Sequence, residues 1–129
     1  MSRSARPALA LALLVGGTAL ALPGAAGAAT GACAPETGDW CTSVAKRDGR
    51  RVLALTTFSF RGSVKICVTG PQQRTCRTAK LRKTKDGIFR AAVNWRSGFP
   101  NQGAGRYRVT FTPDVTGDKL GPTLSFTIA

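Results

Sequence analysis

The sequence predicts a small all-β domain of two packed sheets, held by two disulfides. Short segments with alternating apolar and polar residues recur along residues 40–128, separated by Gly, Pro, Asn and Asp. No segment shows the three-to-four-residue apolar spacing of an amphipathic helix. The 129-residue chain also has four cysteines, an even number that suits disulfide pairing.

Residues 1–28 are expected to be a cleaved signal peptide. Arg3 and Arg6 give a short positively charged start, and residues 7–22 are almost all Ala, Leu, Val or Gly. The small residues 26–28 (Ala-Gly-Ala) match the pattern that precedes signal cleavage. The apolar run is short for a membrane-spanning helix, which needs about 20 residues. The sequence therefore predicts secretion.

Residues 29–129 then form one domain, because 101 residues can bury one hydrophobic core but not two. Nineteen Lys and Arg residues less the two in the signal peptide leave 17, and six acids bring the net charge to +11. Such an excess favours anionic partners: wall polymers, acidic polysaccharide, phospholipid surfaces or nucleic acid. The alternative is that the charge only keeps the protein soluble, and the sequence leaves both interpretations open.

The four cysteines, Cys33, Cys41, Cys67 and Cys76, all lie in this domain. Outside the cytosol they are expected to form disulfides. Three pairings are possible, and the simplest joins sequence neighbours, Cys33 with Cys41 and Cys67 with Cys76. Each bridge would close a loop of about ten residues and stabilise the fold by roughly 2–3 kcal/mol. A zinc site is rejected because the chain has no histidine and no Cys-x-x-Cys pair. We predict no metal and no cofactor.

Seven strands are expected after a turn-rich arm at residues 30–39. They cover residues 41–45, 52–60, 63–68, 74–81, 88–95, 106–112 and 124–128. In the third strand Val64, Ile66 and Val68 share the inward face, while Lys65 and Cys67 share the outward face. Pairing Cys67 with Cys76 would join the third and fourth strands across a hairpin.

The position of one tyrosine indicates which kind of two-sheet sandwich to expect. Tyr107 opens the penultimate strand directly after a long loop at residues 97–105. This is where a tyrosine corner lies in immunoglobulin-like sandwiches, with its hydroxyl bonded to backbone upstream. The alternative is an ordinary core tyrosine. With about seven strands, the sequence predicts an immunoglobulin-like two-sheet sandwich.

The chain resembles small secreted actinobacterial proteins with immunoglobulin-like folds, many of which have no assigned function. The resemblance rests on Arg-Tyr-Arg-Val at residues 106–109, Leu-Gly-Pro at 120–122 and Leu-Ser-Phe at 124–126. The last strand is also similar to that of the apoproteins that carry enediyne antibiotics, which are secreted sandwiches with two short disulfide loops. Those carriers are acidic and place their cysteines elsewhere.

Catalytic patterns are missing from the sequence. Without histidine, neither a Ser-His-Asp nor a Cys-His site can be built. The six acids mostly stand beside Gly, Pro or Thr, as turn residues do. Residues 114–118 lack the ligands of a calcium loop and are expected to form a turn. We predict that the protein is not an enzyme.

Successive side chains of a strand point to opposite faces, and this alternation places five cations of the expected strands on the outward face. They are Lys65, Arg74, Lys80, Arg106 and Arg108. If these strands share a sheet, the five stand on one solvent face that can bind a polyanion, with the cluster Arg82, Lys83 and Lys85 at its edge. The alternative is that Lys and Arg merely keep outward positions polar and protect edge strands from aggregation.

The functional hypothesis is a binding module for anionic cell-envelope material. The expected partner is an anionic wall polymer or an unidentified protein, and no membrane span is expected in the mature chain. Specific nucleic-acid binding is not expected, because Tyr107 should point away from the cations and so offer no base-stacking surface. Two alternatives remain: a protease inhibitor that presents the loop at residues 70–75, and a small-ligand carrier. Trp40 and Phe99 are expected to close the ends of the sandwich.

Overall fold

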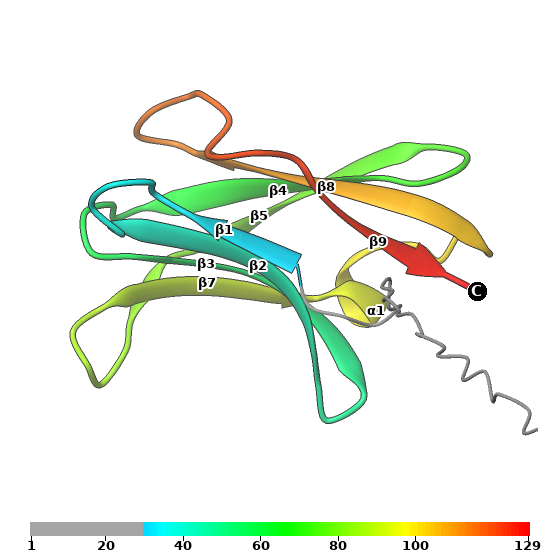
Figure 1. Cartoon of the computed structure of the whole chain (residues 1–129), viewed down its shortest axis with the longest axis horizontal. Helices are drawn as coiled ribbons and strands as arrows, with labels where there is room; N and C mark the ends of the chain where they lie inside the picture. The colour runs from blue at the N-terminus through cyan, green and yellow to red at the C-terminus, as the bar shows by residue number, and fades with distance from the viewer. Residues whose placement is uncertain (1–29) are drawn as a thin grey trace, which may run out of the picture.

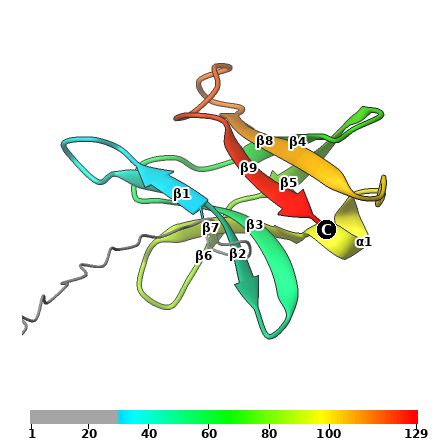
Figure 2. The same ribbon diagram turned by 45° about the vertical axis from the view of Figure 1, so that its right-hand side comes forward.

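The computed structural model describes residues 30–129, which form two antiparallel β-sheets packed face to face (Figures 1 and 2). The prediction of an all-β domain is therefore confirmed. The predicted signal peptide at residues 1–28 lies outside the described residues. Within the described part, no helix is long and apolar enough to cross a membrane.

Nine strands make up the two sheets within residues 30–129. The first sheet contains, in spatial order, β1 (Thr30–Cys33), β2 (Trp40–Arg47), β3 (Arg50–Thr57), β7 (Phe89–Asn94) and β6 (Arg82–Lys83). The second contains β5 (Arg74–Lys80), β4 (Ser63–Thr69), β8 (Gly105–Pro113) and β9 (Leu124–Ile128). A short helix, α1 (Trp95–Gly98), follows β7. Figure 1 shows α1 at the end of the sandwich where β9 finishes.

The two disulfides follow the simplest of the three possible pairings, as the sequence predicted. Cys33 and Cys41 lie opposite each other on β1 and β2, and Cys67 and Cys76 lie opposite each other on β4 and β5. Both pairs are bonded, with Cα atoms 4.0 Å apart. Each disulfide thus fixes the register of two neighbouring strands.

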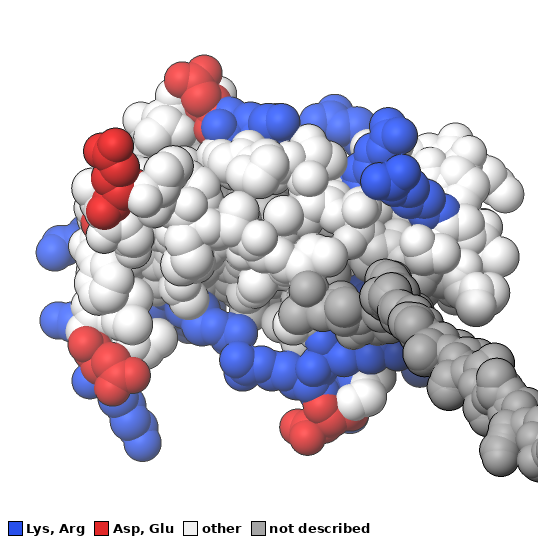
Figure 3. Space-filling view, in the orientation of Figure 1, with Lys and Arg blue, Asp and Glu red and all other residues white. Residues whose placement is uncertain are grey.

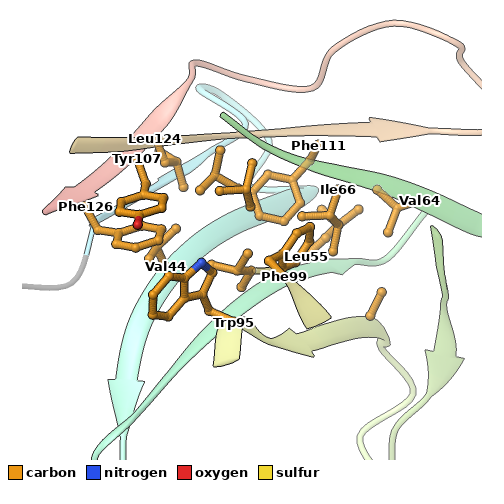
Figure 4. Close-up of a cluster of buried hydrophobic side chains, with 14 of the residues drawn as sticks. Val44, Leu55, Val64, Ile66, Trp95, Phe99, Tyr107, Phe111, Leu124 and Phe126 are labelled. Atoms are coloured by element: carbon orange, nitrogen blue, oxygen red, sulfur yellow. The ribbon is translucent and has the colours of Figure 1, made fainter. Parts of the chain in front are cut away.

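The core lies between the sheets and is closed at one end by aromatic rings (Figure 4). The alternating residues of β4 and β8 face inward as predicted and are fully buried. Tyr107 and Phe126 stack with ring centroids 5.1 Å apart, and Trp95 meets both rings edge to face. Phe99 is 4% exposed, so its predicted burial is confirmed, whereas Trp40 is partly buried against the core.

The Tyr107 hydroxyl bonds to backbone upstream, as the sequence predicted. The Tyr107 hydroxyl donates to the carbonyl of Gly103, four residues upstream, at 2.6 Å, and accepts from the Gln102 amide at 2.9 Å. These bonds tie the end of the long loop to the start of β8.

The strands differ from the prediction in the N-terminal arm, at the ends of β3 and β7, and at β6, which was not predicted. The arm contains the strand β1, although its residues do not alternate between apolar and polar. β1 pairs with β2, and the Cys33–Cys41 disulfide joins the two strands. β3 ends at Thr57, whose hydroxyl accepts from the amides of Ser59 and Phe60 and so turns the chain. β7 ends at Asn94, whose side chain caps α1 by accepting from the Arg96 amide at 3.1 Å.

Candidate anion-binding surfaces

Charge is segregated by secondary structure. Every charged residue in the described strands is Lys or Arg, and α1 adds Arg96. The six acids all lie in turns and loops: Glu36, Asp39, Asp48, Asp86, Asp114 and Asp118. In Figure 3 the acidic side chains stand at the rim, while Lys and Arg gather below β2, β3 and β7 and again near β8. The sheet faces therefore carry charge of one sign.

The five cations expected on one solvent face lie on the outer face of the second sheet, and all are exposed. We call them the cationic face: Lys65, Arg74, Lys80, Arg106 and Arg108. The register shows why they share it. Thr69 on β4 pairs with Arg74 on one side and Arg108 on the other, and Ser63 pairs with Lys80.

The cationic face is an extended row rather than a cluster. Arg74 and Arg108 are two strands apart, or about 10 Å, and Arg106 is on the same strand as Arg108. The Cys67–Cys76 disulfide lies next along the sheet, and the two lysines lie beyond it. From Arg106 to Lys80 the row covers eight residue steps, about 27 Å.

A hollow at the β6 edge continues this row onto the first sheet. Its cations are Lys80, Arg82, Lys83 and Arg90, and its volume is about 450 Å³. No acid lines it among the described residues. The Thr84 hydroxyl at its wall is buried and has no hydrogen-bond partner in the described part of the chain. Of the predicted edge cluster, Arg82 and Lys83 line the hollow and Lys85 does not.

A second hollow, which sequence analysis missed, lies at the end of the sandwich near α1. We call it the terminal cleft. Its volume is about 540 Å³, and its charged lining within the described residues consists of Lys46, Arg50, Arg51 and Arg96. The β2–β3 hairpin forms one wall, and Asn94 to Ser97 and Asn101 form the other, beside Ile128.

Arg51 is the least exposed of the four cations in the terminal cleft. Its guanidinium lies 4.4 Å from the centroid of the Phe126 ring, a cation–π distance. Burial lowers the pKa of Arg51 from its usual value. Arginine nevertheless stays charged in proteins, so this cation is held against the core with fewer waters around it.

The loop proposed for a protease inhibitor is a tight turn. The Gly70 amide donates to the Gln73 carbonyl at 2.9 Å, and the Gln102 side chain accepts from the amides of Gln72 and Gln73. Arg74 lies in β5 rather than at the tip of the loop. The loop is therefore held against the domain by the Gln102 side chain.

The charged side chains of these surfaces are donors, suited to holding oxyanions by charge-assisted hydrogen bonds. Among residues 30–129 there is no group of three or more His, Cys, Asp or Glu side chains that could hold a metal ion. Comparison of the chain with protein-family models, with curated proteins and with solved structures found no match in any of the three.

Proposed function

We propose that this protein is a secreted, non-enzymatic binding module that holds an extended anionic polymer of the cell envelope on its cationic face. The main observation behind this proposal is the row of five exposed cations, about 27 Å long, on a sheet that has no acid in its strands. A row of this length suits a chain with repeated charges better than one compact ligand.

The arginine end of the row provides the strongest contacts in this proposal. A guanidinium can form two parallel hydrogen bonds to one phosphate or sulfate, which lysine cannot do. Arg74, Arg106 and Arg108 offer three such forks on two strands separated by β4. The loop acid Asp114 is at the opposite end, where its amide donates to the Ser63 carbonyl.

Secretion and the immunoglobulin-like arrangement belong to the same proposal. Secretion is supported by the signal-like residues 1–28 and by two disulfides, which persist outside the cytosol. The immunoglobulin-like arrangement is supported by the strand orders β2-β3-β7-β6 and β5-β4-β8-β9 and by the hydrogen bond from Tyr107 to Gly103. Kinship with small secreted actinobacterial proteins rests on the sequence resemblance.

The test is retention on the cell-wall fraction of the producing organism across a salt series, with heparin and DNA as comparison polyanions. The variant replaces Arg74, Arg106 and Arg108 with Gln. The matched control replaces three exposed cations away from the cationic face, Arg47, Arg61 and Lys119, with Gln. Both variants have the same net charge.

We expect the face variant to elute at lower salt, with the slope of log affinity against log salt reduced by about 2–3. The control variant should elute close to the unmodified protein. Equal losses in the two variants would show that retention depends only on net charge and would overturn the proposal. Release from wall, heparin and DNA at the same salt concentration would do the same.

A further inference from the structure

The β2–β3 hairpin sets like charges directly opposite each other in two successive rows. Lys46 pairs with Arg51, and Arg47 pairs with Arg50. Like charges in opposite positions of a sheet destabilise it. The turn between them, Asp48-Gly49, has positive φ at both residues (51° and 76°), the geometry that fits a two-residue hairpin. The cations are therefore held together in a fixed register.

Lys46 and Arg51 are also on the inward-facing side of the strands. Each lies two residues along its strand from a core residue, Val44 or Leu53, and so points to the same face; these core residues are 3% and 0% exposed. The two cations lie beyond the last pairs of β2 with β1 and of β3 with β7, where the hairpin extends past the sheet. Lys46 is exposed there, whereas Arg51 is half-buried against the Phe126 ring, which solubility does not explain. These side chains line the terminal cleft.

The polar groups on the opposite wall also donate. The Asn94 side-chain oxygen accepts from the Arg96 amide at 3.1 Å, and the Asn101 side-chain oxygen accepts from the Gly103 amide at 2.8 Å. Each oxygen already accepts one hydrogen bond, and the NH₂ group of each side chain can only donate. Four cations and two amide donors therefore surround the same space, and no acid lines it among the described residues.

We propose that the terminal cleft is a binding site for a compact dianion, a phosphate monoester on a small polar body. A dianion offsets the repulsion among Lys46, Arg50, Arg51 and Arg96 better than a single carboxylate does. The volume of about 540 Å³ is typical of small-molecule sites, which leaves room for an organic body beside the phosphate. Trp95 and Ile128 supply the apolar part of the wall.

This site is separate from the cationic face, since no residue is shared between them. The inference goes beyond the polymer-binding proposal and does not depend on it. Either site can fail in its own assay without affecting the other.

The test is an NMR titration of the ¹⁵N-labelled protein with glycerol 2-phosphate at constant ionic strength. The chain has two tryptophans, so the spectrum contains two indole N–H signals. The Trp95 indole nitrogen lacks a hydrogen-bond acceptor within the described residues, and its ring lines the cleft. Trp40 packs beside Gly121, away from the cleft, and serves as the internal reference.

We expect saturable shifts of the Trp95 indole and of the Gly49 and Arg50 amides, with the Trp40 indole unmoved. Arg51→Gln should weaken binding at least about tenfold, the loss of one charge-assisted contact. Lys46→Gln, at a more exposed position, should weaken it similarly and remains informative if the Arg51 variant is poorly folded. Lys119→Gln is the matched control and should change the affinity less than about twofold. Lys119 lies beside Leu120, whose amide bonds the Phe111 carbonyl, about 20 Å along β8 from the residue that pairs with Ile128 of the cleft. Exposed charges at that distance are screened.

Two results would overturn the proposal. One is a linear, unsaturated shift, or equal shifts with acetate at the same ionic strength. The other is an equal loss of affinity in Lys46→Gln and Lys119→Gln, which would reduce the effect to net charge. Saturable binding that is lost in Lys46→Gln but kept in Lys119→Gln supports the site, whatever the result of the polymer assay.

Discussion

The Tyr107→Phe substitution removes one hydroxyl group from a side chain that is 0% exposed. That hydroxyl has two close hydrogen bonds, to the Gly103 carbonyl at 2.6 Å and from the Gln102 amide at 2.9 Å, and a long contact of 3.5 Å with the Asn101 side-chain oxygen. An internal hydrogen bond contributes about 0.5–1.5 kcal/mol, so the two together predict a loss of about 2 kcal/mol in the free energy of unfolding. The loss is no larger because the loop partners are partly exposed and water can replace the hydroxyl.

Urea denaturation followed by tryptophan fluorescence measures this loss. The midpoint should fall while the slope m stays constant, because the substitution does not change the surface exposed on unfolding. For a domain of this size, 2 kcal/mol corresponds to a fall in Tm of about 10 °C. Thr127→Val removes an exposed hydroxyl on β9 and is the control. A loss below about 0.5 kcal/mol, the usual range for surface substitutions, would refute the structural role given to Tyr107.

Two further predictions concern a close packing contact and the effect of pH. Gly121 and Gly117 have similar positive φ (73° and 71°), but a Cβ at Gly121 would lie 2.7 Å from the Trp40 ring and one at Gly117 would meet nothing within 4 Å. In thermal denaturation, Gly121→Ala should therefore destabilise by at least about 1 kcal/mol more than Gly117→Ala; equal losses would contradict the packing of Trp40. Because the chain has no histidine, polymer retention should change little between about pH 5.5 and 8.5. Phosphate-monoester binding, measured by the same titration, should weaken below about pH 6 because the ligand itself takes up a proton; constant affinity down to about pH 5 would contradict the preference for a dianion.

Strand alternation predicted the core because a strand with one buried face must place its apolar residues two apart. Val64, Ile66 and Val68 follow this rule, and all three are at most 1% exposed. β1 and β6 were not predicted because their own residues lack a strand pattern. They are strands because they pair with β2 and β7. The Cys33–Cys41 bond holds β1 against β2, and β6 is two residues beside β7.

The same strand alternation predicted which cations form the cationic face but not how they are arranged on it. Lys65, Arg74 and Arg108 were placed outward from their own strands alone, and their positions agree with the register. The sequence did not show that the arginines stand at one end and the lysines at the other, because that depends on which residues pair across strands. Register is a long-range property, fixed here by the Cys67–Cys76 bond.

The terminal cleft was missed although its signal is present in the sequence. Lys46 and Arg51 point to the same face as the buried residues Val44 and Leu53, yet they lie just outside the predicted strands at residues 41–45 and 52–60. Of the two, Lys46 is exposed and Arg51 is half-buried, and a half-buried charge is costly unless it has a partner, which makes Arg51 more informative than an outward cation. The five residues of the cationic face have an ordinary explanation in solubility and edge protection, so their function depends wholly on a comparison of equally charged variants. Arg51, half-buried against the Phe126 ring, has no such explanation, and for that reason the cleft that it lines is the more specific clue to what this protein binds.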